Sequence, residues 1–415
     1  MSARRDLGID FCGVHFVNPV MLSSSPVSNT GEMIGRAFDA GFGGVAYKTI
    51  GMGNIKIVHP FPRMATYDVD GKKVVGLQNV EQISDRPFDD NLADIRFLKK
   101  RWPDRIVIAS IMGFSNDEWR ELAIACQDAG ADMLELNFSC PHMTVEGSGM
   151  KVGQAFDLVE KFTATVKKVV KIPVLAKMTP NVTDINEPAL SAKRGGADGI
   201  AAINTVSGLV GIGLDDFVPR PNIFGKGAMS GYSGPAVKPI GLRCVAQMAG
   251  SPDLKLPISG IGGIETWVDT VEYLLVGAST VQITTGVIHY GYRIVEDILE
   301  GMSDFMEQHG FARVADFVGK AVPNVVHTDQ FDLKRQGIAS YDLDRCVGCG
   351  QCHVVCHDAG GQCLSWDSAN RRPVMDEKRC LGCLICSFVC PVNHPSLITA
   401  REVPGKAEVR PPASR

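Results

Sequence analysis

Long apolar runs are missing from this 415-residue sequence, and no stretch approaches the roughly 20 residues that a membrane helix needs. The first residues, MSARRDLGIDFCG, carry two arginines but no hydrophobic segment behind them, so no signal peptide is expected. A strong charge of one sign is also missing. The formal net charge is -4 and no basic stripe occurs, which argues against nucleic acid or a membrane surface as a partner. We therefore expect a cytoplasmic protein.

The glycine motifs of nucleotide sites are absent as well. Neither G-x-G-x-x-G nor G-x-x-x-x-G-K-[ST] occurs, so a Rossmann site for a nicotinamide dinucleotide is not expected in this chain. With 45% hydrophobic and 21% charged residues, the composition is that of a soluble globular protein that can bury a large core.

Cysteine is plentiful near the C-terminus, where nine of the 13 cysteines lie between Cys346 and Cys390. Two runs, CVGCGQCHVVC and CLGCLICSFVCP, share the spacing C-x2-C-x2-C-x3-C. In such a run three thiolates bind one cubane iron-sulfur cluster and the fourth cysteine binds the other cluster. We expect two [4Fe-4S] clusters, one held by Cys346, Cys349, Cys352 and Cys390, the other by Cys380, Cys383, Cys386 and Cys356.

Structural zinc and disulfides are the alternatives for these cysteines. Zinc sites use paired C-x2-C knuckles rather than triplets, and the spacing is too regular for a secreted disulfide framework. The run resembles the two-cluster ferredoxins of bacteria over residues 338–400, although His357 and not proline follows Cys356. Cys363 is left over, and we predict that it is a small buried apolar residue.

Before the cysteine runs, short β-rich segments alternate with longer amphipathic ones. Eight segments have the composition of strands: PVMLSS, GGVAYK, RIVIASI, DMLELNF, IPVLAKM, GIAAIN, LPISG and TVQITT. This alternation predicts an α/β fold, a (β/α)8 TIM barrel, with a doubly wound sheet as the alternative. The predicted organisation is a barrel domain at 1–320, a linker at 321–337, a small α+β ferredoxin-like domain at 338–400 and a tail at 401–415.

Polar residues and glycines stand where the predicted barrel strands end. Active sites of such barrels form there, because the loops that follow the strands converge on one mouth. Any one of these residues alone is more simply a cap or turn residue. The glycines of SGIGGIET, together with the threonines of TTG, suit a phosphate site, since backbone N-H groups can approach an anion there. The strand-end residues are Ser24, Lys48, Thr49, Asn137, Lys177, Asn204, Thr205, Gly262, Gly263, Thr284 and Thr285.

Five stretches carry a family resemblance: NFSCPHM, LAKMTPNVTDI, AAINTVSGL, GYSGPAVKPIGLR and ISGIGGIETW. With them the barrel resembles the dihydropyrimidine dehydrogenase branch of the dihydroorotate dehydrogenase-like flavoproteins. The resemblance implies an FMN enzyme of pyrimidine degradation that reduces the 5,6 double bond of uracil or thymine. It also implies that a separate FAD- and NAD-binding iron-sulfur subunit supplies electrons from NAD(P)H, in a heterotetramer.

The resemblance also assigns roles to single residues. Lys48 or Lys177 would stabilise negative charge near N1 of the reduced flavin. The implied FMN-binding residues are Ser24, Lys48, Thr49, Lys177, Gly234, Gly262, Gly263, Thr284 and Thr285. The implied substrate-binding residues are Asn79, Glu81, Asn137, Asn204 and Thr205. Amides and a carboxylate suit this task, because a uracil ring alternates carbonyl acceptors with N-H donors.

Cys140 is the implied catalytic acid. A thiol of ordinary pKa, about 8.5, is mostly protonated at neutral pH, so it can give a proton to C5 while hydride reaches C6. A water relay, or a small apolar plug at a strand end, is the alternative. The following segment, HMTVEGSGMKVGQ, suits a loop that closes over substrate, although Met143 stands where the family commonly has glycine.

Three other functions are open to this sequence. The first is a dihydroorotate dehydrogenase-type flavoenzyme, against which Glu81 argues, because a second carboxylate close to orotate would be repelled. The second is a non-catalytic electron-transfer subunit, against which the intact Cys140 and the asparagine set argue. The third, a zinc-binding interaction module, requires a different interpretation of the cysteine runs.

Overall fold

The computed structural model describes residues 5–54, 56–69, 73–138, 150–393 and 395–405. The chain divides into two compact units, Met1–Val325 and Val326–Arg415. This division falls within 321–337, the range predicted as a linker, and the exact domain limits stay a prediction. None of the helices described here has the length and apolar character required to cross a membrane.

A closed barrel of eight parallel strands is the centre of the first unit, which confirms the predicted fold. Each of the eight segments with strand composition forms one barrel strand. In chain order the barrel strands are β3 (Val20–Leu22), β4 (Gly44–Ile50), β7 (Ile106–Ile111), β8 (Met133–Asn137), β9 (Val174–Met178), β10 (Gly199–Ala202), β13 (Ile258–Ile261) and β14 (Ala278–Ile283). A short hairpin of β1 (Ile9–Phe11) and β2 (Val14–Phe16) precedes them.

Helices alternate with these strands and cover the barrel. Their sequences explain where several begin: Thr30, Ser115 and Thr266 each accept a backbone N-H of the first turn as N-caps. The helices of this unit are α1 (Gly31–Ala40), α2 (Phe88–Arg101), α3 (Asn116–Asp128), α4 (Met150–Gln154), α5 (Phe156–Lys167), α6 (Asn186–Arg194), α7 (Lys238–Ala249), α8 (Trp267–Leu275), α9 (Thr285–Tyr290) and α10 (Ile294–His309). Every residue of β4 and β7 is buried, so these strands are mainly apolar instead of alternating, with Lys48, Thr49 and Ser110 as buried polar exceptions.

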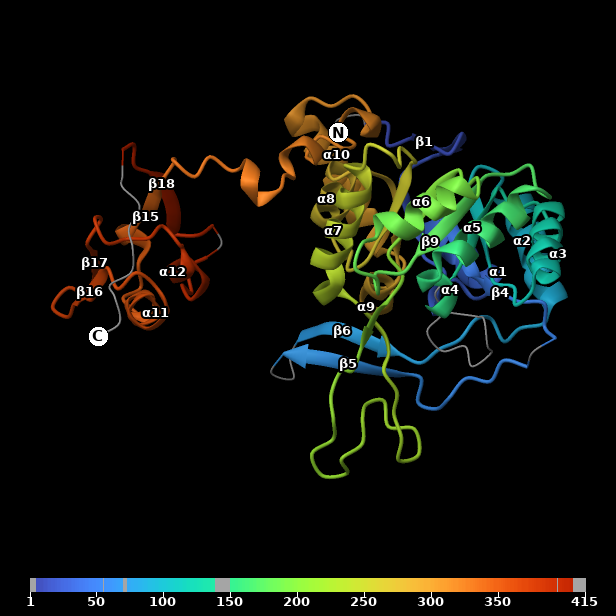
Figure 1. Ribbon diagram of the computed structural model, residues 1–415, viewed down its shortest axis with the longest axis horizontal. Helices are drawn as coiled ribbons and strands as arrows, with labels where there is room; N and C mark the ends of the chain where they lie inside the picture. The colour runs from blue at the N-terminus through green and yellow to red at the C-terminus, as the bar shows by residue number, and fades with distance from the viewer. Residues whose placement is uncertain (1–4, 55, 70–72, 139–149, 394, 406–415) are drawn as a thin grey trace. The chain divides into compact units, whose positions relative to one another are not determined.

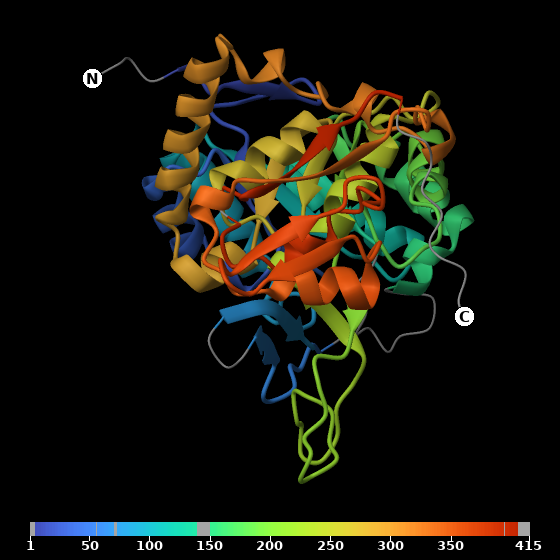
Figure 2. The same cartoon turned by 90° about the vertical axis from the view of Figure 1, so that its left-hand side faces the viewer.

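A second sheet, which the sequence analysis did not predict, lies outside the barrel. It is antiparallel in the order β11 (Val206–Gly208), β12 (Ser230–Ser233), β6 (Lys73–Asn79) and β5 (Met64–Val69). Its strands follow β4 and β10 along the chain, so the sheet belongs to the carboxyl-terminal mouth of the barrel. Figures 1 and 2 show this sheet on the same side of the barrel as the long loop between β11 and β12.

Short elements around buried cysteines make up the second unit. β15 (Gly337–Tyr341) pairs with β18 (Ile398–Glu402), and β16 (Leu364–Asp367) pairs with β17 (Arg372–Met375), both antiparallel. The helices are α11 (Gln351–Ala359) and α12 (Ile385–Phe388). Six cysteines belong to the buried core of this unit, so its interior is built from thiols as much as from aliphatic side chains.

Candidate active site

The carboxyl ends of the barrel strands and the antiparallel sheet enclose a cavity of about 150 Å³. All fourteen described residues that the sequence analysis assigned to flavin or substrate line this cavity. They are Ser24, Lys48, Thr49, Asn79, Glu81, Asn137, Lys177, Asn204, Thr205, Gly234, Gly262, Gly263, Thr284 and Thr285. Cys140, the implied acid, lies outside the described residues, as does Met143.

A buried ion pair lies at one wall of the cavity. Lys177 Nζ is 3.1 Å from Glu135 Oε1, with the two side chains 5% and 0% exposed. The amide of Gln282 donates to Glu135 Oε2 at 3.0 Å, so each carboxylate oxygen has its own donor. Because a buried charge is costly unless it is paired and hydrogen-bonded, Glu135 is what allows a lysine to stand at this depth.

A chain of hydroxyl and amide groups crosses the base of the cavity. The Thr49 hydroxyl lies 3.0 Å from the hydroxyls of both Ser24 and Ser110, and Asn137 Nδ2 donates to it at 3.0 Å. Asn204 Nδ2 in turn donates to Asn137 Oδ1 at 3.2 Å. Each amide is therefore held in one orientation by its neighbour, which preorganises donors and acceptors for a polar ligand.

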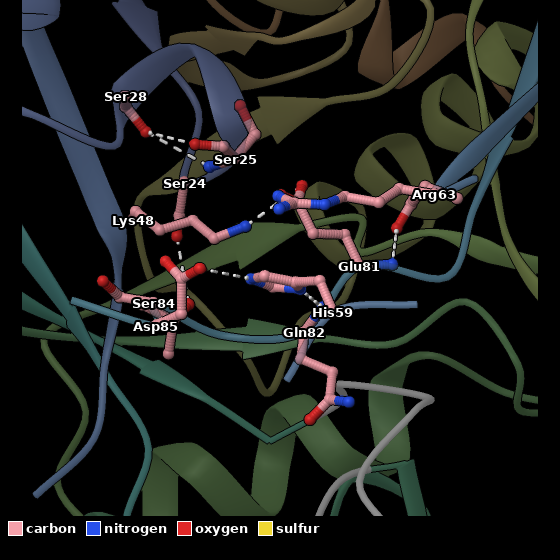
Figure 3. A network of polar contacts seen from close by, with 12 residues as sticks. Ser24, Ser25, Ser28, Lys48, His59, Arg63, Glu81, Gln82, Ser84 and Asp85 are labelled. Carbon is pink, nitrogen blue, oxygen red and sulfur yellow. Dashed lines mark hydrogen bonds and ion pairs between the residues drawn. The ribbon is translucent and has the colours of Figure 1, made fainter. Parts of the chain in front are cut away.

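Glu81 lies between two cations at the side of the cavity (Figure 3). Lys48 Nζ is 3.2 Å from Glu81 Oε2, and Arg63 Nη1 is 3.1 Å from Glu81 Oε1. The Lys48 and Glu81 side chains are only 7% and 8% exposed. A carboxylate contacted on both oxygens by cations is an acceptor in a fixed position, able to receive an N-H group.

His59 supports the segment that carries Glu81. The backbone N-H of Gln82 donates to His59 Nδ1 at 3.2 Å, so the ring carries its proton on Nε2, which lies 3.7 Å from Asp85 (Figure 3). Burial, and after it the nearby Arg63 cation, lowers the pKa of His59. The neutral ring is therefore the form that holds the Gln82 backbone in place.

The glycine end of the cavity leaves backbone open to a ligand. Gly262 and Gly263 have φ of 127° and 69°, a region that side chains rarely adopt. A Cβ on Gly263 would lie 2.8 Å from the Gly234 carbonyl oxygen. Ser233 and Thr285 add hydroxyls 3.1 Å apart. Close backbone and hydroxyl donors fit the phosphate end of a flavin mononucleotide.

The cysteines of the second unit line two cavities, and their division matches the two sets expected from spacing. One cavity is lined by Cys346, Cys349, Cys352 and Cys390, the other by Cys356, Cys380, Cys383, Cys386 and Cys363. Over the described ranges, no three metal-binding side chains converge on a single ion. In a cubane each cysteine binds a different iron atom, so four thiols around a cavity fit a cluster better than one zinc ion.

Tyr341 lies in the wall of both cysteine cavities. Its buried hydroxyl lies beside the Cys386 thiol and has no nitrogen or oxygen partner among the described residues. Such a donor costs free energy unless something accepts from it, and cluster sulfur is an acceptor. The position of this hydroxyl beside a cysteine sulfur is a second observation that fits clusters in these cavities.

Several cavity or support residues were missed by the sequence analysis. Glu135 was visible in principle, since it is a charged residue inside the apolar strand segment MLELN and must find a buried partner. Arg63 and His59 gave no such signal, because they reach Glu81 and Gln82 only through the folded segment that precedes β5.

Comparison with known proteins finds a family for each of the two units. A family model described as dihydroorotate dehydrogenase matches residues 6–306, and one described as 4Fe-4S dicluster domain matches residues 339–397. The chain is 50% identical to the NAD-dependent dihydropyrimidine dehydrogenase subunit PreA of Escherichia coli (strain K12), covering 94% of each chain. It is 38% identical to the chloroplastic dihydropyrimidine dehydrogenase (NADP(+)) of Arabidopsis thaliana, over 80% of this chain and 81% of that one. It is also 40% identical to the catalytic subunit of dihydroorotate dehydrogenase B (NAD(+)) of Pyrococcus abyssi, over 76% of this chain and 99% of that one.

Proposed function

This chain belongs to the dihydroorotate dehydrogenase family, and we propose that within it the chain is the catalytic subunit of a dihydropyrimidine dehydrogenase. It would reduce uracil or thymine to the 5,6-dihydropyrimidine in pyrimidine degradation. One observation carries the proposal: the residues suited to a flavin and those suited to a pyrimidine line the same cavity, in a chain whose second unit holds two sets of four cysteines.

The substrate set has the chemistry of a pyrimidine imide edge. The proposed contacts are Asn79, Glu81, Asn137, Asn204 and Thr205, which together offer amide donors, amide acceptors and one carboxylate acceptor. Asn137 and Asn204 are already oriented by each other and by Thr49, so little ordering is needed when a ring binds. We expect Glu81 to accept a ring N-H.

FMN is the proposed cofactor of the barrel, and when bound it would supply hydride to C6 of the pyrimidine. Lys177, or Lys48, would place a positive charge beside the isoalloxazine, and Glu135 keeps the Lys177 ammonium at a fixed place. Ser24 and Thr49 would contribute hydroxyls. The ribityl chain and phosphate would lie along Gly234, Gly262, Gly263, Thr284 and Thr285.

Cys140 is proposed to protonate C5. The residue lies outside the described part of the chain, so the role rests on its place in NFSCPHM, two residues past the end of segment DMLELNF. The expected pattern is that of general acid catalysis: Cys140→Ala keeps flavin and clusters but slows pyrimidine reduction by about 10²-fold or more. Near-normal turnover in that variant would transfer the role to another donor.

Electrons are proposed to come from NAD(P)H on a partner subunit that binds FAD and carries iron-sulfur clusters of its own. The chain's two [4Fe-4S] clusters would carry electrons onward from it, one at a time. A heterotetramer with this partner subunit, in the cytoplasm, is the proposed assembly. The relative from Escherichia coli is itself named a subunit, which supports a partner.

A test of the function uses the purified full chain under anaerobic conditions. The protein is reduced with dithionite, the excess is removed, and uracil, thymine or orotate is added while flavin and cluster absorbance is followed. Reoxidation by uracil or thymine, with the dihydro product on chromatography, is the expected result. Bound clusters without any flavin would leave an electron carrier and refute the proposal.

A dihydroorotate dehydrogenase is the second candidate, because the barrel is 40% identical to such an enzyme over nearly the whole of that chain. Glu81 favours the first candidate, since a carboxylate accepts a ring N-H group but has no donor to offer the carboxylate of orotate. Reoxidation by orotate alone would favour this candidate over the first.

A further inference from the structure

Cys363 is a fifth cysteine in the wall of a cavity suited to one cluster. It lines the same cavity as Cys356, Cys380, Cys383 and Cys386, and it is 7% exposed. Its sulfur lies 3.6 Å from that of Cys356. Since a cubane in this motif takes four cysteine ligands, one of the five thiols is left without iron.

The backbone fixes Cys363 in this position. Its carbonyl oxygen accepts the Asp376 N-H at 2.8 Å, and the next residue, Leu364, begins the antiparallel pairing of β16 with β17 at Met375. The thiol is therefore held against Cys356 by the sheet on one side and by helix α11, which carries Cys356, on the other. Cys356 itself has the position in the C-x2-C-x2-C-x3-C run that supplies the fourth ligand, so Cys363 is the thiol that remains.

We propose that Cys363 is a non-ligating thiol that donates an S-H···S hydrogen bond to the Cys356 sulfur and thereby raises the reduction potential of the cluster that Cys356 binds. A buried thiol outside a ligand set remains protonated, so it can donate. The added electron increases negative charge on the cluster and its cysteine sulfurs. A donor to one of those sulfurs stabilises the reduced state more than the oxidised state, and the potential rises.

The rise in reduction potential should be confined to one cluster. The cavity lined by Cys346, Cys349, Cys352 and Cys390 has no further cysteine among its described lining residues. The two cluster sites of the repeated motif therefore differ in their cysteine content. The cluster beside Cys363 would be the one that stays reduced for longer. Cys363 is thus a tuning residue that acts through Cys356, and this inference depends on the clusters but not on the pyrimidine activity.

The test compares Cys363→Ala and Cys363→Ser with the parent chain, using the full-length protein with its clusters. Cys126→Ala is the matched control, because Cys126 is also a buried thiol but lies in the barrel unit. Iron content and the reduction of each cluster are measured in an anaerobic redox titration followed by electron paramagnetic resonance. The spectrum and the potential respond to a lost sulfur contact, whereas a purely structural role would change stability alone.

In Cys363→Ala one cluster should keep its iron but become harder to reduce. A thiol is a weak donor, so we expect the ratio of reduced to oxidised cluster at a fixed potential to fall by roughly three- to tenfold, where tenfold corresponds to about 59 mV. Cys363→Ser should recover much of the shift, since a hydroxyl also donates, and Cys126→Ala should show none. An unchanged potential in Cys363→Ala would overturn the proposal. So would loss of half the iron, because Cys363 would then be a ligand.

Discussion

Replacing Glu135 by glutamine removes one charge of the buried pair beneath the cavity and leaves the other. Lys177 is 5% exposed and Glu135 is fully buried, so solvent cannot take over the role of the lost carboxylate. Removing one partner of a buried pair generally costs about 3–5 kcal/mol, because an uncompensated charge remains. The hydrogen bond from Gln282 is weakened as well, since its acceptor becomes neutral. We expect the free energy of unfolding of the barrel to fall by about 4 kcal/mol.

Denaturant unfolding followed by tryptophan fluorescence measures this change. Three of the four tryptophans, Trp102, Trp119 and Trp267, lie in the barrel unit, so the signal reports mainly on that unit. The control breaks an exposed helical pair by Arg36→Ala, which removes the partner of Glu32. That pair should contribute only about 0.3–0.5 kcal/mol.

The double variant Glu135→Leu/Lys177→Met separates charge from packing. Replacing both members of a buried pair with apolar residues of similar volume is often neutral, so the double variant should be more stable than Glu135→Gln alone. Two results would refute the reasoning: a loss below about 1 kcal/mol in Glu135→Gln, or a double variant less stable than that single one. Either would mean that the ammonium of Lys177 does not depend on Glu135.

Two further predictions concern Gly263 in the cavity wall and His59, which supports the Gln82 backbone. Gly263→Ala should weaken retention of FMN, because the added Cβ meets the Gly234 carbonyl oxygen at 2.8 Å and the residue has positive φ. The flavin content after gel filtration measures this loss. Gly53→Ala is the control for positive φ alone, because a Cβ on Gly53 would meet nothing within 4 Å. Because burial and then Arg63 lower the pKa of His59, the folded protein takes up this proton less readily than the unfolded chain. Stability from His59 should therefore be complete above its ordinary pKa of about 6.5 and decline as the pH falls below it. Thermal unfolding between about pH 5 and pH 8 should show a shallower acid slope in His59→Gln, and an unchanged slope would contradict this.

The sequence predicted the barrel because each strand is short, apolar and bounded by turn residues. Since parallel strands place their carboxyl ends together, it also predicted that Lys48, Asn137 and Lys177 would lie close to one another, as they do at the cavity. In a barrel, residues that are far apart in the chain but stand at the ends of parallel strands line the same cavity. Predicting this grouping requires only the order of the strands, which the alternating pattern supplies.

The antiparallel sheet was missed for a different reason. Its strands interrupt the alternation after β4 and β10, and the pairing of Met64 with Asn79 is set by a register that depends on the whole fold. The dipeptide Asp70-Gly71 is a hairpin signal that could have indicated the pair β5 and β6. Nothing comparable marks Arg63 as the partner of Glu81, because an arginine in a loop is ordinarily solvated.

Glu81 shows why this missed sheet matters for chemistry. Lys48 at the end of β4 and Arg63 just before β5 contact its two oxygens from different sides. A carboxylate has about four lone-pair sites, and the two cations contact one on each oxygen, so a ring N-H can be accepted without displacing either cation. The cations also offset the cost of burying the negative charge before substrate arrives. The barrel supplies one cation and the segment leading into the sheet supplies the other, so recognition of a neutral N-H group depends on both parts of the unit.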